Sequence, residues 1–318
     1  MDKDFEFSIV DPIDPRFIPE PYVLKTTDPD LLKYSPDQER DERGRFSSGG
    51  GDGSSSFRDT RTAAGGRSLN PKEAENQKGG SGASHLISDG RGGVRFSPER
   101  AALHEKIIQE RLANIPRSDN PKFIMLGGGP ASGKSSSGVD KWEDPHVKID
   151  VDSIKAQLPE YDPKNPGFVH EESSYIGKEI MARAFAGNQN ILLDGTGNNS
   201  VESVSGKIDT ARAYGYSVEG RYLTVPTEQA VKQDADRSRS VGEEKVYEIH
   251  SAVSKIFADI APKFDSVNLY DSRVKGNPTL VATGGSGKLD VVNQSLYSQF
   301  LGKATDYSDY LETNLGRS

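Results

Sequence analysis

The stretch "MLGGGPASGKSSSG", residues 125–138, decides the fold because it contains a complete G-x-x-x-x-G-K-S motif, the Walker A pattern. An apolar run, "KFIML" (122–126), leads into the glycines, and a helix can begin at Lys134. Glycines let successive backbone N–H groups turn toward phosphate oxygens, and the amino end of the helix adds partial positive charge. The motif therefore predicts a loop that binds the phosphates of a nucleotide. The loop is formed by Gly128, Gly129, Pro130, Ala131, Ser132, Gly133, Lys134, Ser135 and Ser136.

Two side chains of this loop have expected tasks. Lys134 is expected to reach the β- and γ-phosphates, and the Ser135 hydroxyl to help hold Mg²⁺. A second G-x-G-K run, "TGGSGKL" (283–289), has Ala282 in place of the required glycine and Leu289 in place of the hydroxyl residue. That second run predicts a hairpin turn instead of a nucleotide site.

Short apolar runs alternate with helical patterns after residue 121. Strands are expected at 122–126, 147–151, 190–194, 217–225 and 266–271, and helices near 171–187, 200–214, 227–240 and 243–261. This alternation predicts an α/β protein with the P-loop NTPase fold, in which helices flank a mostly parallel sheet. A hairpin over 277–292 and one final helix are expected to end the chain.

The chain before this region has a different composition. Residues 1–40 are rich in Pro and Asp and are expected to form an extended arm. Residues 41–95 are rich in Gly and Ser and are expected to be a disordered linker, because they bury too little apolar surface to offset the loss of chain entropy. A folded domain is expected over 96–318, with its core at 122–271 and a first helix that Pro116 ends.

The overall composition excludes several kinds of site. The chain has no cysteine, so disulfides, thiolate zinc sites and cysteine nucleophiles are excluded. Its net charge of −8 argues against a nucleic-acid or membrane partner. No apolar run approaches the length of a membrane span, and "MDKDFEFSIV" lacks the layout of a secretory signal, so we expect a cytoplasmic protein.

Carboxylates follow the second and third strands, where parallel sheets bind their ligands. Asp150 and Asp152 stand two residues apart, so one can face Mg²⁺ and the other an acceptor, and Asp152 is placed to act as a general base. An alternative for Asp152 is the N-cap of the next helix. Asp194 ends the third expected strand, and Thr196 follows it in a turn bracketed by glycines. Together they favour binding of a polar acceptor.

Two arginines, Arg237 and Arg239, lie in "DADRSR" (234–239) and can offer guanidinium groups to the γ-phosphate as charge develops on it. From spacing alone, a solvated helix face explains them equally well. A phosphate-binding loop by itself also leaves open whether the protein is a kinase, a GTPase or a mechanical ATPase.

The order of these motifs resembles the zeta toxin family of P-loop kinases. The resemblance covers about 123–271 and is carried by "GGGPASGKS", "IDVDSIK", "NILLDGTGNN", "ARAYGYSVEGRYLTVP" and "DADRSR". It implies a kinase domain over 96–318 that transfers phosphate from ATP to UDP-N-acetylglucosamine or a related nucleotide sugar, with an antitoxin as a possible partner.

The resemblance also implies roles for single residues. Lys134 and Ser135 correspond to the positions that bind ATP phosphates and Mg²⁺, Asp152 to the general base, and Arg237 and Arg239 to arginines on the phosphates. Asp194, Thr196 and Glu179 correspond to the positions that bind the acceptor. Asp194 stands where better-known members have Glu, and Asn198 stands where some have Arg, which bears on the acceptor's identity.

The segment "QERDERGRFSSGGG" (38–51) is similar to segments of structural proteins of phages that infect actinobacteria. This similarity implies a phage-structural partner or a location on the virion for the amino-terminal region. Two other functions stay open on the sequence: a nucleoside or polynucleotide kinase, and a non-catalytic nucleotide-binding module on a phage structural protein.

Overall fold

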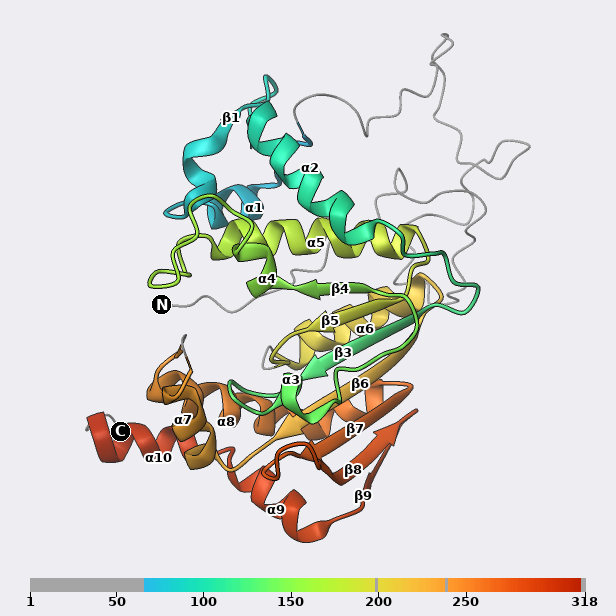
Figure 1. Cartoon of the computed structure of the whole chain (residues 1–318), viewed down its shortest axis with the longest axis vertical. Coiled ribbons are helices and arrows are strands. Elements are labelled where there is room, and N and C mark those ends of the chain that lie inside the picture. Colours follow the sequence, from blue (N-terminus) through green and yellow to red (C-terminus); the bar gives the residue numbers. More distant parts are fainter. Residues whose placement is uncertain (1–65, 198–199, 238–239, 316–318) are drawn as a thin grey trace.

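The computed structural model describes residues 66–197, 200–237 and 240–315, and its centre is one seven-stranded sheet (Figure 1). The strands are ordered β4-β5-β3-β6-β7-β8-β9. The first five run parallel, and β8 and β9 continue the sheet antiparallel at one edge. The predicted α/β fold with a mostly parallel sheet is confirmed. The strands are β3 (Lys122–Gly127), β4 (Val147–Asp150), β5 (Ile191–Asp194), β6 (Ser217–Thr224), β7 (Ser266–Asp271), β8 (Thr279–Gly285) and β9 (Lys288–Val291).

Helices connect the parallel strands and bury one face of the sheet. The main apolar core joins Phe123 and Met125 on β3 to buried side chains of α2, α5, α6 and α8. The other face carries Ile124, Leu126 and Leu192, against which Trp142 packs. The helices are α2 (Pro98–Leu112), α3 (Lys134–Ser137), α4 (Val151–Lys155), α5 (His170–Ala186), α6 (Val201–Ala213), α7 (Thr227–Ala235), α8 (Glu243–Ile260), α9 (Gln294–Gly302) and α10 (Asp306–Leu315), with a short 3-10 helix, η4 (Ala261–Lys263). Among the described residues, no helix combines the length and apolar character needed to cross a membrane.

Strand register places the expected site residues at the carboxyl ends of the parallel strands. The central strand β3 lies between β5 and β6, with Leu126 beside Asp194 and Gly127 beside Tyr222. Asp150 at the end of β4 is paired with Asp194 at the end of β5. Because all four strands are parallel, their carboxyl ends and the loop after β3 share one edge.

Part of the expected linker is folded, which corrects the prediction for 41–95. Residues 66–96 form α1 (Pro71–Asn76), the 3-10 helix η3 (Ser81–His85) and the hairpin strands β1 (Leu86–Ser88) and β2 (Val94–Phe96). Leu69 and Phe96 join the main core. Glycines at positive φ, such as Gly90 (75°) and Gly92 (89°), form the turn between β1 and β2. These glycines therefore form turns in a folded segment. The rest of the expected linker and the expected arm, residues 1–65, lie outside the described residues.

Three helix predictions differ from the structure at their ends. The first helix stops at Leu112 instead of reaching Pro116, and Asn114 follows it with a left-handed φ of 62°. Helix α7 ends at Ala235, earlier than expected. The expected single final helix is two helices, α9 and α10. Helix α9 ends at Gly302, and the side chain of Lys303, which follows, is buried.

The turn between β8 and β9 confirms the prediction for the second G-x-G-K run. Gly285 pairs with Lys288, so the loop is two residues long, and both Ser286 (φ 52°) and Gly287 (φ 85°) are left-handed. Two positive φ values in a two-residue hairpin define a type I′ turn.

Candidate active site

The phosphate-binding loop follows β3 and ends in the short helix α3. Gly128 (φ 128°), Ala131 (φ 55°) and Gly133 (φ 80°) have positive φ values, so the loop curls back on itself. The Lys134 ammonium donates a hydrogen bond to the Gly128 carbonyl at 2.9 Å, across the loop. The Gly128 N–H donates to the Thr196 carbonyl at 2.7 Å, which ties the loop to the turn after β5.

Neighbouring backbone and side chains leave no room for larger residues at the start of this loop. A Cβ atom on Gly128 would lie 2.5 Å from the Leu223 carbonyl oxygen, and one on Gly129 would lie 2.4 Å from the His250 ring. Ser272, which directly follows β7, donates a hydrogen bond from its hydroxyl to the Ser132 carbonyl, at 2.5 Å. The loop is therefore packed against β6, α8 and the β7–β8 connection.

Four charged residues from three segments act on Lys134. Burial lowers the pKa of Lys134, and the nearby carboxylates of Asp194, Asp152 and Asp150 oppose that effect, while Arg237 adds to it. The structure thus brings together the loop lysine, the acids after β4 and β5, and the arginine after α7. A cationic group facing both carboxylates and an arginine is suited to a polyphosphate and a polar acceptor.

The two acids after β4 have separate roles. The Asp150 side chain is the N-cap of α4 and accepts hydrogen bonds from the N–H groups of Asp152 (3.0 Å) and Ser153 (3.4 Å). The alternative role of helix cap thus belongs to Asp150 and not to Asp152. The Asp152 side chain is 57% exposed and forms an ion pair with the buried Lys155 at 3.2 Å.

Asp194 lies half-buried at the end of β5, next to Lys134. Burial raises the pKa of Asp194, and Lys134 counteracts this rise. The Lys148 ammonium lies 3.8 Å from the Asp194 carboxylate. Thr196 follows two residues later, with its backbone bonded to Gly128.

A buried carboxylate holds the loop that carries Arg237. Asp234 accepts hydrogen bonds from the Ser240 hydroxyl (2.6 Å) and the Val241 N–H (2.9 Å), and it pairs with Arg237 at 3.6 Å. The Asp234 side chain is 2% exposed, whereas that of Arg237 is 52% exposed. The sequence offered Asp234 only as part of "DADRSR", and Arg239 lies outside the described residues.

Glu179 is the one described site candidate that the structure does not bring to this cluster. Its carboxylate accepts hydrogen bonds from the Arg67 guanidinium at 2.7 and 2.9 Å, and Arg67 also pairs with Glu73. It is not among the principal charges acting on Lys134. Arg67 belongs to the folded amino-terminal segment that was expected to be linker, so this pairing was not visible in the sequence.

The donor set fits a magnesium ion held mainly by a bound nucleotide. Ser135 is exposed beside Lys134, in the position where the motif supplies a hydroxyl ligand. Within the described part of the chain, no group of three His, Cys, Asp or Glu side chains forms a metal site. Mg²⁺ commonly keeps waters and uses phosphate oxygens with few protein ligands, which agrees with one hydroxyl.

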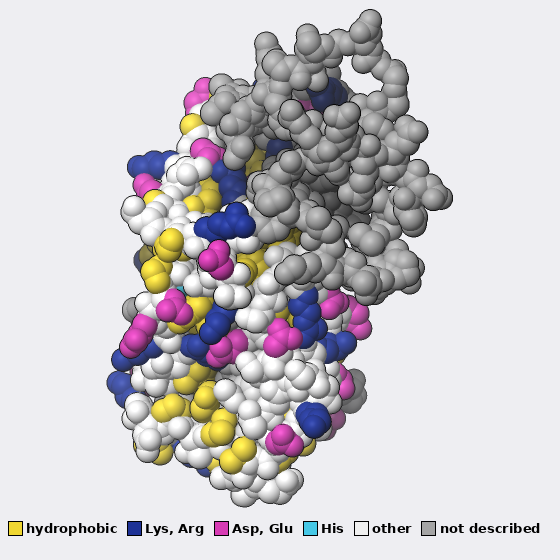
Figure 2. Space-filling view, turned by 90° about the vertical axis from the view of Figure 1, so that its right-hand side faces the viewer, with side chains coloured by type: hydrophobic (Ala, Val, Ile, Leu, Met, Phe, Trp, Pro, Cys, Tyr) yellow, Lys and Arg dark blue, Asp and Glu magenta, His cyan; other side chains and the backbone are white. Residues whose placement is uncertain are grey.

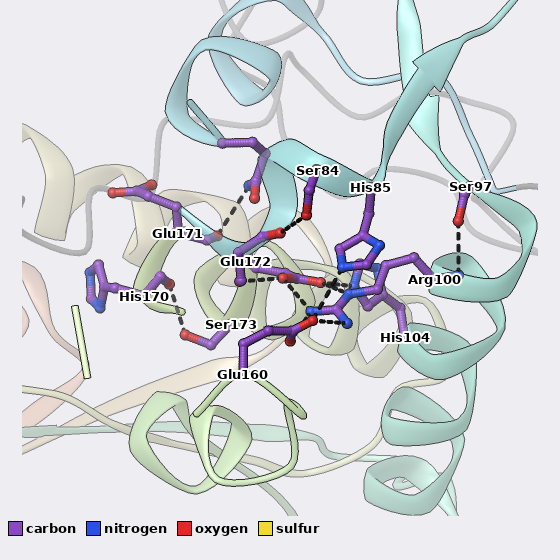
Figure 3. Close-up of polar contacts among 12 residues, drawn as sticks. Ser84, His85, Ser97, Arg100, His104, Glu160, His170, Glu171, Glu172 and Ser173 are labelled. Carbon is purple, nitrogen blue, oxygen red and sulfur yellow. Dashed lines mark hydrogen bonds and ion pairs between the residues drawn. The ribbon is translucent and has the colours of Figure 1, made fainter. Parts of the chain in front are cut away.

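A second polar cluster, which we call the Glu172 cluster, lies at the start of α5 (Figure 3). Arg100 and His104 on α2 and Ser81 on η3 all bond the fully buried Glu172, at 2.8, 2.6 and 2.5 Å. Burial alone would raise the pKa of Glu172, but these bonds lower it to about 2. Arg100 also pairs with Glu160 in the α4–α5 loop. The cluster joins the amino-terminal segment to α5, and its spread over four segments hid it from sequence reasoning.

Comparison with known proteins gives the family. The model of the zeta toxin family matches residues 106–278, which is more than half of the chain. The chain belongs to the zeta toxin family. This membership confirms the resemblance drawn from the motifs and supports a kinase-type toxin function.

Solved structures share the fold of this zeta toxin family member. The AvrRxo1-ORF1:AvrRxo1-ORF2 crystal structure with sulphate ions matches with a TM-score of 0.54 and 19% identity, over 65% of this chain and 74% of that chain. A crystal structure of AvrRxo1-ORF1:-ORF2 with ATP matches equally, with the same TM-score, identity and coverage. The PezAT chromosomal toxin-antitoxin system of Streptococcus pneumoniae matches at 17% identity and a TM-score of 0.47, over 69% of this chain and 96% of that chain. A search of curated protein sequences gave no match.

Proposed function

We propose that the protein is an ATP-dependent kinase that transfers the γ-phosphoryl group to a hydroxyl of a nucleotide sugar, UDP-N-acetylglucosamine or a close relative. The observation that carries this proposal is the group of charges around Lys134, namely Asp194, Arg237, Asp152 and Asp150. A purely nucleotide-binding module needs the phosphate-binding loop but has no use for an exposed carboxylate and an arginine close enough to act on its lysine.

In the proposed reaction, Asp152 accepts the proton of the acceptor hydroxyl, whose oxygen then forms a bond to the γ-phosphorus. The bond between the γ-phosphorus and the bridging oxygen breaks, and ADP leaves. Lys134 and Arg237 stabilise the negative charge that develops on the transferred group. Asp152 is the better base of the two acids after β4, because the Asp150 carboxylate is engaged in capping α4.

Asp194 and Thr196 are proposed to bind the acceptor beside Lys134. Ser135 would hold Mg²⁺, which neutralises phosphate charge when it is bound with ATP. Glu179 is left out of this proposal, because its carboxylate is paired with Arg67, which also binds Glu73.

The test is ATP consumption and product formation with a panel of UDP-sugars, nucleosides and 5′-hydroxyl oligonucleotides. We expect a UDP-sugar to be phosphorylated by wild-type protein and not by Lys134→Ala. Lys288→Ala is the matched control, because Lys288 lies in the exposed look-alike hairpin and its loss should leave activity intact. Nucleotide binding without turnover of any acceptor would instead support a non-catalytic module.

The polynucleotide acceptor is the less favoured arm of this panel. On the face in Figure 2, Lys and Arg side chains of the described residues are interspersed with Asp and Glu and form no basic stripe. A nucleic-acid substrate usually requires such a stripe. Phosphorylation of the oligonucleotide in preference to UDP-sugars would replace our acceptor assignment.

A protein antitoxin is the proposed partner, and the cytoplasm the proposed site of action. The AvrRxo1-ORF1 structures are complexes with AvrRxo1-ORF2, which supports a search for a comparable partner of this chain. The proposed phage-structural role falls on the amino-terminal residues outside the described part. Expression in a bacterial host should arrest growth with wild-type protein and not with Lys134→Ala, and equal growth of the two would argue against a toxin.

A further inference from the structure

A buried lysine from the carboxyl-terminal segment contacts the end of β6 and a histidine of α8, next to the phosphate-binding loop. Lys303 lies between α9 and α10, and its side chain is buried. The ammonium lies 2.9 Å from the Thr224 hydroxyl, 2.8 Å from the Val225 carbonyl and 2.7 Å from Nδ1 of His250. An ammonium has three N–H donors, so these three partners use all of them. Burial lowers the pKa of Lys303 to about 7, and these three contacts fix its side chain in place.

The same contacts define the protonation of the His250 ring. Its Nε2 atom lies 2.9 Å from the Pro130 carbonyl oxygen in the phosphate-binding loop. A carbonyl only accepts, so Nε2 carries the proton and donates it, and Nδ1 is left to accept from Lys303. Burial, followed by the nearby Lys303 ammonium, lowers the pKa of His250 to about 3, so the ring is neutral at physiological pH.

The His250 ring also packs against the loop backbone at Gly129. A Cβ atom on Gly129 would lie 2.4 Å from the His250 ring, so the glycine and the imidazole are in close contact. Lys303 in turn is fixed to the end of β6 through Thr224 and Val225. The chain of contacts therefore runs from the end of β6, through Lys303 and His250, to the backbone of the loop.

We propose that Lys303 and His250 are positioning residues of the nucleotide site, which set the Pro130 segment of the loop in the shape that receives the phosphates. The region matched by the family model ends at residue 278, so Lys303 belongs to a part of the chain outside it. The segment between α9 and α10 thus supports the nucleotide site through the contact of Lys303 with His250. This inference rests on the proposed function as far as the ligand is a nucleotide.

The inference gives different expectations for two substitutions of His250. Gln places an amide N–H near the position of Nε2 and keeps a donor for the Pro130 carbonyl, whereas Leu removes that donor. We expect His250→Leu to raise the dissociation constant of MgADP about tenfold, and His250→Gln to raise it less than about threefold. Lys303→Met removes the partner of Nδ1 and is expected to weaken MgADP binding about tenfold as well.

Lys207→Met is the matched control for loss of a buried lysine. Lys207 on α6 is as buried as Lys303 and has its pKa lowered by burial in the same way, but it lies outside the contact chain. MgADP affinity is measured by isothermal titration calorimetry on the full chain, with a thermal melt of each variant. In a steady-state assay, the substitutions at His250 and Lys303 should raise KM for ATP more than they lower kcat, whereas Lys207→Met should change neither.

Nitrogen-15 NMR of the histidine rings provides a second test, which does not depend on whether Lys303→Met folds. The wild-type protein should show His250 as the Nε2–H tautomer, assigned by its loss in His250→Gln. An Nδ1–H tautomer overturns the inference, and so does a folded Lys303→Met or His250→Leu that binds MgADP as wild type does. If wild-type protein binds no nucleotide, the proposed function fails instead, and the tautomer still decides whether the contact exists.

Discussion

Asp150 and Asp152 look equivalent in the sequence, and the structure distinguishes them by their hydrogen bonds. Asp150 caps α4, while Asp152 presents an exposed carboxylate held by Lys155. The sequence placed both acids at the site but left the choice between cap and base open. Which of two neighbouring carboxylates meets the free N–H groups depends on where the helix begins, and a shift of one or two residues reverses the answer.

Exchange of each acid should therefore affect a different property. Asp152→Asn is expected to lower kcat by about 10²- to 10⁴-fold, because the amide cannot take the acceptor proton, with MgADP affinity unchanged. Asp150→Ala is expected to lower the free energy of unfolding by about 1 kcal/mol through loss of the cap. Steady-state kinetics and urea unfolding of both variants check this. A fully active Asp152→Asn would remove Asp152 from the role of general base.

Glu172 gives a prediction for acid pH. Its pKa is lowered from 4.5 to about 2 in the folded chain, so its contribution to stability is complete above pH 4.5. As the pH falls from 4.5 to about 2, the unfolded chain takes up the proton first, and stability is lost. Since a shift of this size corresponds to about 3 kcal/mol, Glu172→Gln should lower the free energy of unfolding at pH 7 by about that amount or more.

Urea unfolding at several pH values between 7 and 2.5 tests this prediction. Glu172→Gln should show a shallower loss of stability in acid than wild-type protein, because the titrating group is gone. Glu99→Gln, an exposed acid on the same helix as Arg100, is the control and should change stability by less than about 0.5 kcal/mol. Equal stability of wild-type protein and Glu172→Gln at pH 7 would contradict the assigned role.

Between α7 and α8, the Asp234 carboxylate binds described residues on the far side of residues 238–239, namely Ser240 and Val241. The sequence predicted helices on both sides of this connection, but α7 ends at Ala235 and the chain then turns around the Asp234 carboxylate. A helical pattern gives no sign of these contacts, because they join the Asp234 carboxylate to the Ser240 hydroxyl and to the N–H groups of Val241 and Gly242, six to eight residues away. Arg237 therefore lies beyond the end of the helix, with its guanidinium 3.6 Å from the Asp234 carboxylate.

Asp234→Ala should loosen the connection that carries Arg237. We expect kcat to fall about tenfold, since the guanidinium loses its fixed partner while the phosphate-binding loop stays intact. Asp236→Ala, an exposed acid two residues later, is the matched control and should leave kcat unchanged. Loss of MgADP binding and of kcat in equal measure would indicate general damage instead of a misplaced arginine.

For the whole molecule, the sequence predicted the sheet, the phosphate-binding loop and the acids beside it, because each depends on local patterns. Strand runs, glycine spacing and acids at strand ends are all read within a few residues. The folded segment 66–96, the Glu172 cluster and the contact of Lys303 with His250 join residues far apart in the chain. The segment before residue 96 is rich in Gly and Ser, and Glu172 and Lys303 are charged, so composition alone assigns them to linkers and surfaces.

The contacts of residues 66–97 place the start of the folded domain before α2. Residues 66–97 supply Leu69 and Phe96 to the core, Ser81 to the buried Glu172, and Arg67 to Glu179. A chain that begins at residue 98 would expose the apolar side of α2 and α5 and leave Glu172 without one of its hydrogen bonds. We expect chain 98–318 to unfold at a lower temperature than chain 66–318 by several degrees or more, since a loss of about 1 kcal/mol already shifts the midpoint by about 2–4 °C. Differential scanning calorimetry measures the unfolding midpoint of each chain. Equal midpoints would indicate that residues 66–97 are a linker and do not stabilise the domain.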